Sequence, residues 1–244
     1  MLIAEIGLNH LGNVTKLNDF LGLVGSVDAI TVQVIADEFY NDERYHSLKI
    51  LDSDLIDFLI SFKDKGGKIG IAIDDHRKID LFDSIGVDFY KVLSKDMLNE
   101  SLIQKMLETK AESIYVSTGM SDFSQIDQLV DSINLPTDRV KLIHTQLSNN
   151  VNDVNLKAIQ IMKDKYQLSI AYGHHCDVLN TMYVSTAFKP VATFFYVKGD
   201  DIDCNYPDNK HAVAFSQVEK VIKNMRNCQT SIGDGVKQKM KNWV

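Results

Sequence analysis

The chain has 244 residues, of which 45% are hydrophobic and 24% are charged, enough for one sizeable core. With only 13 glycines and 3 prolines it is neither fibrous nor broadly disordered. The net charge of -7 argues against a dedicated nucleic-acid surface, which usually presents a clustered basic face.

No stretch approaches the roughly 20 apolar residues of a membrane-spanning helix. Residues 1–7 lead into a polar segment without the basic region or cleavage site of a signal peptide. The cysteines, Cys176, Cys204 and Cys228, include no CxxC pair, and their odd number suits a reducing compartment. These features predict a cytoplasmic protein that binds neither membranes nor nucleic acid.

Apolar runs of strand length alternate with amphipathic helical stretches, which indicates repeated βα units. The predicted strands are 2–7, 29–35, 68–73, 88–94, 113–118, 139–145, 168–173 and 191–197. The clearest predicted helices are 53–66, 100–110, 124–134 and 154–166. Eight units over this length average about 30 residues, the size of one strand, one crossover helix and two loops. The sequence therefore predicts an α/β protein with a single (β/α)8 TIM barrel over residues 1–244.

A doubly wound open sheet is the alternative fold. It would normally carry a GxGxxG turn after the first strand, and the segment IGLNHLGN from Ile6 does not match that pattern. The basic amphipathic segment 233–244 is expected to cap the barrel or to meet a neighbour.

Polar residues follow the predicted strands in unusual number. In a closed barrel they would gather at the C-terminal face, where barrel enzymes have their active sites. They are Glu5, Asn9, His10, Gln33, Asp74, Asp75, His76, Lys91, Ser94, Asp96, Ser117, Thr118, His144, Thr145, Gln146, His174, His175, Lys198 and Asp200.

Lys91, Ser94 and Ser117 together could hold an anionic phosphate or carboxylate. Alternatively, Lys91 pairs with an acid of another strand, or acts as a Schiff-base lysine. Glu5 lies within an apolar run, so it is either paired inside the barrel or directed at a ligand. His174 and His175 are adjacent and should point to opposite sides, so at most one would serve a shared metal.

Six segments stand in series: IAEIGLNHLGN from Ile3, YKVLSKDMLNESLIQKM from Tyr90, YVSTGM from Tyr115, IH from Ile143 followed by DVNLKAI, AYGHHC from Ala171, and NYPDNK from Asn205. In this order and spacing they resemble the barrel domain of the sialic acid synthase (N-acetylneuraminate synthase, NeuB-like) family over nearly the whole chain. The IAEIGxNHxG and STGM motifs are specific, and the second half is similar more loosely.

The resemblance implies condensation of phosphoenolpyruvate with the aldehyde of an N-acylmannosamine or related sugar, forming a 3-deoxy-2-keto sugar acid and phosphate. In that family a divalent metal, manganese or magnesium, polarises the aldehyde. Carried over by position, the implied catalytic acids are Glu5, Asp96 and Asp208. The implied substrate-binding residues are Gln33, Lys91, Ser94 and Ser117, and the implied metal ligand is His175.

This chain departs from the family pattern at several positions. Thr31 stands where a lysine would meet the phosphoenolpyruvate carboxylate, Val197 where a second metal histidine is expected, and Gly173 in place of a serine. The candidate replacement ligands are His10, His174, Asp200 and His211, and Lys198, one residue from the vacant position, is a candidate compensating residue. The antifreeze-like domain of many relatives has no counterpart, and a homodimer or a separate partner chain is expected.

Three functions therefore compete. The first is a divergent synthase acting on phosphoenolpyruvate and a sugar aldehyde. The second is a noncatalytic or partner-dependent barrel that binds sugar or phosphate. The third is a lyase or aldolase that uses Lys91 with different chemistry.

Overall fold

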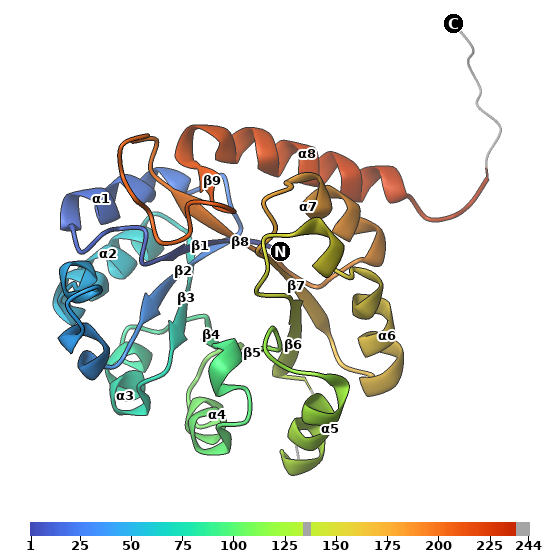
Figure 1. Ribbon diagram of the computed structural model, residues 1–244, viewed down its shortest axis with the longest axis horizontal. Coiled ribbons are helices and arrows are strands. Elements are labelled where there is room, and N and C mark those ends of the chain that lie inside the picture. The colour runs from blue at the N-terminus through green and yellow to red at the C-terminus, as the bar shows by residue number, and fades with distance from the viewer. Residues whose placement is uncertain (134–137, 238–244) are drawn as a thin grey trace, which may run out of the picture.

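The computed structural model describes residues 1–133 and 138–237 and shows eight parallel strands in a ring with helices outside it (Figure 1). The ring is closed because β1 pairs with both β2 and β8. The strands are β1 (Leu2–Gly7), β2 (Ala29–Val34), β3 (Lys68–Ile73), β4 (Phe89–Val92), β5 (Ser113–Ser117), β6 (Val140–Thr145), β7 (Ile170–His174) and β8 (Thr193–Lys198).

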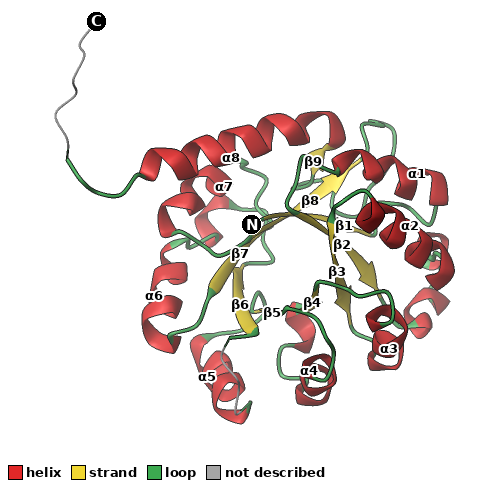
Figure 2. Cartoon of the chain, turned by 180° about the vertical axis from the view of Figure 1, so that it is seen from behind, coloured by secondary structure: helices red, strands yellow, loops and turns green. Residues whose placement is uncertain are grey.

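The helices surround the strands, as the opposite view in Figure 2 also shows. They are α1 (Val14–Asp19), α2 (Asp52–Asp64), α3 (Ile79–Asp83), α4 (Glu100–Leu107), α5 (Phe123–Ser132), α6 (Lys157–Tyr166), α7 (Asn180–Ser185) and α8 (Val218–Ile232). Short 3-10 turns join several of them to the strands. This arrangement confirms the predicted (β/α)8 barrel, and the doubly wound alternative is wrong.

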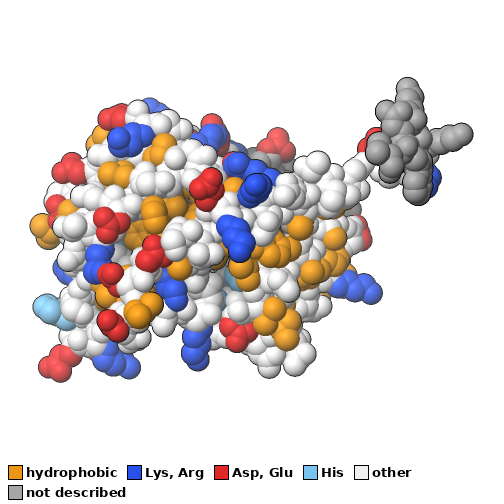
Figure 3. All heavy atoms as spheres, turned by 90° about the horizontal axis from the view of Figure 1, so that it is seen from above, with side chains coloured by type: hydrophobic (Ala, Val, Ile, Leu, Met, Phe, Trp, Pro, Cys, Tyr) orange, Lys and Arg blue, Asp and Glu red, His pale blue; other side chains and the backbone are white. Residues whose placement is uncertain are grey.

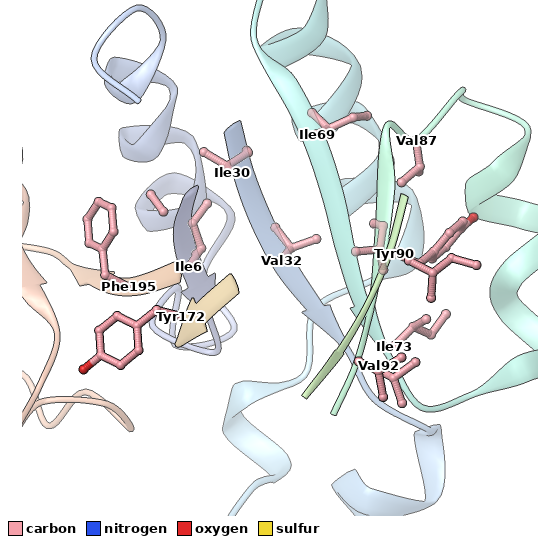
Figure 4. Close-up of a cluster of buried hydrophobic side chains, with 14 of the residues drawn as sticks. Ile6, Ile30, Val32, Ile69, Ile73, Val87, Tyr90, Val92, Tyr172 and Phe195 are labelled. Carbon is pink, nitrogen blue, oxygen red and sulfur yellow. The ribbon is translucent and has the colours of Figure 1, made fainter. Parts of the chain in front are cut away.

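Alternation along each strand separates two apolar layers. Side chains facing the barrel axis form a compact inner cluster that includes Ile3, Phe89, Tyr115 and Phe194. Side chains facing outward pack in the larger cluster between sheet and helices, part of which Figure 4 shows. The inner cluster fills the end of the barrel near the N-terminal ends of the strands. Polar inward-facing residues therefore gather at the opposite end, near the C-terminal ends of the strands.

A short strand, β9 (Val213–Ala214), pairs with the end of β8 outside the ring. The residues between β8 and β9 therefore return to the barrel mouth before α8 begins. Residues 233–237 follow α8 without helical structure, and the rest of the predicted amphipathic segment lies outside the described residues, as does the last residue of the predicted helix 124–134.

The surface carries both signs of charge. Acidic and basic side chains are interspersed on the face seen in Figure 3. No helix within the described ranges combines the length and apolar character needed to cross a bilayer.

Candidate active site at the barrel mouth

A buried ion pair lies at the centre of the mouth. Lys91 of β4 donates to Glu5 of β1, and their side chains are only 5% and 3% exposed. The Lys91 Nζ also lies 5.2 Å from the ring centroid of Phe194 and 5.9 Å from that of Tyr196. Glu5 is thus paired inside the barrel, one of the two arrangements its sequence context allows. Schiff-base chemistry is favoured when a lysine is buried without a carboxylate beside it. The ion pair with Glu5 therefore disfavours that role for Lys91.

A cavity of about 220 Å³ opens beside this pair. Five of the eight implied site residues line it: Gln33, Lys91, Ser94, Ser117 and His175. The remaining lining residues are Leu93, Lys95, Met120, Leu147 and Tyr196. Strands β2, β4, β5 and β8, together with the residue after β7, therefore contribute to one hollow.

Two serine hydroxyls meet on the wall of the cavity. Ser94 donates to the Ser117 Oγ at 3.1 Å, and the backbone N–H of Gly119 donates to the Ser94 Oγ at 3.1 Å. A Cβ at Gly119 would lie 2.8 Å from Thr145 and 2.9 Å from the Ser94 hydroxyl, so this close approach requires glycine. Thr118 donates to the Ile143 carbonyl and serves the backbone instead. The wall thus offers hydroxyl groups beside the Lys91 ammonium, a combination suited to an anionic group.

Asp208 reaches the mouth from the segment between β8 and β9. Its backbone N–H donates to the Asn9 Oδ1 at 3.2 Å, and its carboxylate contacts Gly7, where a Cβ would lie 3.2 Å from Oδ2. Burial, and then the negative charge of Glu5, raises the pKa of Asp208 to about 7, against the opposing effect of Lys91. A carboxyl with this pKa can hold or release a proton near neutral pH.

His175, Tyr196 and His211 form an aromatic cluster next to the cavity. The ring centroids of His175 and His211 lie 4.7 Å apart, and Tyr196 lies 5.4 Å from His175 and 5.2 Å from His211. Burial, with smaller effects of His211 and Lys91, lowers the pKa of His175 to about 2. The His211 Nε2 is 3.6 Å from the Asp208 Oδ1 and has no hydrogen-bond partner in the described part of the chain. Burial also lowers the pKa of His211, to about 4, so both imidazoles are neutral at physiological pH.

The position assigned to the missing metal histidine needs correction. Val197 packs in the outer layer between β8 and the helices, with no exposed surface, so its side chain cannot reach the mouth. The inward-facing residues of β8 are Phe194, which packs in the inner cluster, and Tyr196, which lines the cavity. Since side chains alternate along a strand, Tyr196 faces the position where a second ligand would have to stand.

The proposed replacement ligands and Lys198 are mostly engaged elsewhere. His174 points away from the axis, where its Nδ1 lies 3.3 Å from the Thr181 hydroxyl. His10 accepts from the Gly12 N–H, Lys198 donates to the Asn209 carbonyl, and Asp200 accepts from Ser216. Only His211 contacts His175.

The described side chains around His175 do not form a divalent-metal site. Across residues 1–133 and 138–237, no group of three or more histidine, cysteine, aspartate or glutamate side chains is arranged to hold a metal ion. Tyr196, whose pKa burial raises well above its usual value, is a poor ligand beside His175. The residues in place do not fit the expected manganese or magnesium site.

Asp96 lies outside the cavity lining and pairs with Lys95, whose Nζ is 3.0 Å from the Asp96 Oδ2 and 2.9 Å from the Asp74 Oδ2. Thr31 is buried on β2 two residues before Gln33, deeper in the barrel. The sequence interpretation missed Lys95 and Tyr196 as lining residues. Strict alternation along β8 would have identified Tyr196, and the polar turn after β4 would have included Lys95.

Comparisons with known proteins bear on this site. The NeuB family model matches residues 70–237. The N,N'-diacetyllegionaminic acid synthase of Campylobacter jejuni subsp. jejuni serotype O:2 is 25% identical over 174 residues, 68% of this chain and 51% of that protein. The protein of the same name from Legionella pneumophila subsp. pneumophila is 25% identical over 274 aligned residues, 99% of this chain and 75% of that protein. This chain therefore spans about half the length of the first of these relatives.

Solved structures share the barrel. The N-acetylneuraminic acid (sialic acid) synthetase of Leptospira borgpetersenii serovar Hardjo-bovis superposes with a TM-score of 0.87 at 20% identity, covering 98% of this chain and 87% of that one. A truncated 3-deoxy-D-arabino-heptulosonate 7-phosphate synthase of Thermotoga maritima gives a TM-score of 0.75 at 12% identity, covering 95% and 87%. Both support the fold. Because the family model matches well over half of the chain, the protein belongs to the NeuB family.

Proposed function

We propose that this protein is a synthase that condenses phosphoenolpyruvate with the aldehyde of an N-acylmannosamine or related sugar to form a 3-deoxy-2-keto sugar acid. The observation that carries this proposal is the single cavity in which Lys91, Ser94 and Ser117 converge from β4 and β5. Family membership supports a phosphoenolpyruvate-dependent reaction of this kind.

In the proposed reaction, C3 of phosphoenolpyruvate forms a bond to the aldehyde carbon, and the aldehyde oxygen gains a proton. Water adds at C2, and the resulting tetrahedral intermediate expels inorganic phosphate to leave the 2-keto acid. Lys91 and the two serine hydroxyls bind an anionic group of phosphoenolpyruvate, and Gln33 offers its amide to the substrate.

Asp208 and Glu5 supply the acid–base capacity of the site. Asp208, with its pKa of about 7, can donate the proton that the aldehyde oxygen needs. Glu5 holds Lys91 in place, and its second carboxylate oxygen is buried without a hydrogen-bond partner among the described residues, which leaves it free for a substrate hydroxyl or a water molecule. Asp96 lies outside the cavity lining and pairs with Lys95, so it makes no direct contact with the substrate in this scheme.

The direct test is phosphate release from phosphoenolpyruvate with a panel of N-acylmannosamines and aldoses. Each assay is run with manganese, with magnesium and with a chelator. These conditions are needed because the family is expected to use a divalent metal, whereas the described side chains around His175 do not fit a metal site. We expect release with at least one aldehyde, and a loss of about a hundredfold or more in kcat/KM for Asp208→Asn and Ser117→Ala. Lys68→Ala, which removes an exposed lysine paired with Glu112, is the control that should leave activity unchanged.

A noncatalytic barrel that binds sugar or phosphate is the second candidate. It is favoured by the presence of Tyr196, rather than a metal ligand, beside His175. This candidate predicts phosphoenolpyruvate or phosphate binding without turnover under every metal condition. In that case Ser117→Ala would change affinity alone.

A further inference from the structure

Lys95 is the second cation of the cavity, and the proposed chemistry above gives it no contact with the substrate. It lies in the short turn Ser94–Asp96 that follows β4, four residues beyond Lys91, and it lines the same hollow. Its side chain is 53% exposed, whereas that of Lys91 is only 5% exposed. The cavity therefore has one ammonium group at its base and another at its rim.

The charged residues that line the cavity are two lysines, Lys91 and Lys95. No aspartate or glutamate stands among its lining residues. The carboxylates that pair with the lysines, namely Glu5 behind Lys91 and Asp74 and Asp96 behind Lys95, lie outside that lining. A ligand in the hollow meets two ammonium groups and several hydroxyl or amide groups.

The carboxylates also fix where the Lys95 ammonium lies. Asp74 is tied to the backbone by accepting from the Ala36 N–H at 2.9 Å, and its other oxygen accepts from Lys95 at 2.9 Å. A lysine paired with two carboxylates, one of them anchored to the backbone, loses less conformational freedom when a ligand binds than a free surface lysine would. Lys95 is thus oriented before any ligand arrives.

We propose that Lys95 is a substrate-binding residue that holds one anionic group of a doubly anionic substrate, while Lys91, Ser94 and Ser117 hold the other. This inference rests on the proposed function and names phosphoenolpyruvate, with its carboxylate and its phosphate, as the substrate that bridges both lysines. It also accounts for Thr31 at a position expected to carry a lysine, because the second cation comes from the turn after β4.

The test measures phosphoenolpyruvate binding by isothermal titration calorimetry for the full chain and for Lys95→Gln and Lys95→Arg. We expect Lys95→Gln to raise the Kd by about tenfold to a hundredfold, the range of a lost charged hydrogen bond, and Lys95→Arg to stay within a few-fold of the parent. Lys105→Gln is the matched control, because Lys105 also pairs with two carboxylates, Asp80 and Glu108, but does not line the cavity. It should leave the Kd unchanged.

The outcomes separate this proposal from the proposed function. A Kd for Lys95→Gln within twofold of the parent, with only the melting temperature lowered, would make Lys95 a structural ion-pair residue and overturn the inference. An equal loss in Lys105→Gln would also overturn it, by showing a general charge effect. If Lys95→Gln weakens binding and no aldehyde gives phosphate release, the inference stands and the synthase function fails. If the parent chain binds no phosphoenolpyruvate, both fail.

Discussion

Lys91 and Glu5 form the residue-scale feature on which the site depends most. Each side chain is almost fully buried, so removing one partner leaves a charge without water or a counterion. We predict that Lys91→Met lowers the free energy of unfolding by about 3–5 kcal/mol, measured by urea denaturation.

The control for this prediction is Lys68→Met, which removes an ion pair whose side chains are 48% and 70% exposed. It should cost no more than about 1 kcal/mol. Equal losses in the two variants would mean that water still reaches the Lys91–Glu5 pair.

For single residues, the sequence indicates which side chains need a partner or a ligand, but it does not indicate which residue that partner is. A glutamate within an apolar run had to be paired or directed at a ligand, and it is paired. Its partner is on β4, three strands along the ring from β1, and no local sequence pattern identifies such a partner. Lys95 was missed because a lysine in a polar turn resembles an ordinary solvated residue until the cavity beside it is known.

At the scale of elements, the alternation of β8 decides which side chains can serve the site. Tyr196 faces the cavity and Val197 faces the helices. We predict that Val197→His destabilises the fold by about 2 kcal/mol or more, because it buries an imidazole in an apolar layer. Tyr196→His should fold and gain manganese or zinc binding together with His175, as measured by calorimetry and by metal content after dialysis.

The reverse behaviour of the two variants would contradict the orientation of Tyr196 and Val197 on β8. A stable Val197→His variant that binds metal, with Tyr196→His binding none, would mean that β8 is shifted by one residue.

The positions of the strands were predictable because each combines a buried run with flanking turn residues. Predicted and observed strands agree closely. The largest differences are two residues: β4 ends at Val92 instead of residue 94, β7 starts at Ile170 instead of residue 168, and β8 starts at Thr193 instead of residue 191. Strand β9 has only two residues, too few for any periodicity to show. The assignment to Val197 failed because it followed motif order without checking which face of the strand each residue occupies.

For the whole molecule, buried histidines set the response to acid. Burial lowers the pKa of His10, His174 and His211 to about 4 and that of His175 to about 2. In the unfolded chain these histidines have their ordinary pKa, near 6.5. Below that pH the unfolded chain therefore binds protons that the folded chain does not, and unfolding is accompanied by proton uptake. Stability conferred by neutral histidines is therefore present above about pH 6.5 and is lost as the pH falls below it.

Asp208 acts in the opposite direction, since its pKa of about 7 lets the folded state keep a proton that the unfolded state releases above about pH 4. Four histidines outweigh this one carboxyl. We predict that the free energy of unfolding drops by about 1–4 kcal/mol between pH 6.5 and pH 5.5, measured by urea denaturation at each pH. His10→Asn should make the drop smaller, while His76→Gln, at an exposed position, should leave it unchanged. A free energy of unfolding that is flat over this interval would contradict the burial of these imidazoles.

The pairing of β1 with β8 also has a consequence for synthesis of the protein. Glu5 leaves the ribosome before Tyr196, Asp208 and His211, which follow roughly two hundred residues later in the chain. A nascent chain can pair Glu5 with Lys91 early, but it cannot join the two edges of the sheet or assemble the mouth until the segment after β8 has emerged. The complete ring of strands around the mouth therefore forms only after β8 has been synthesised.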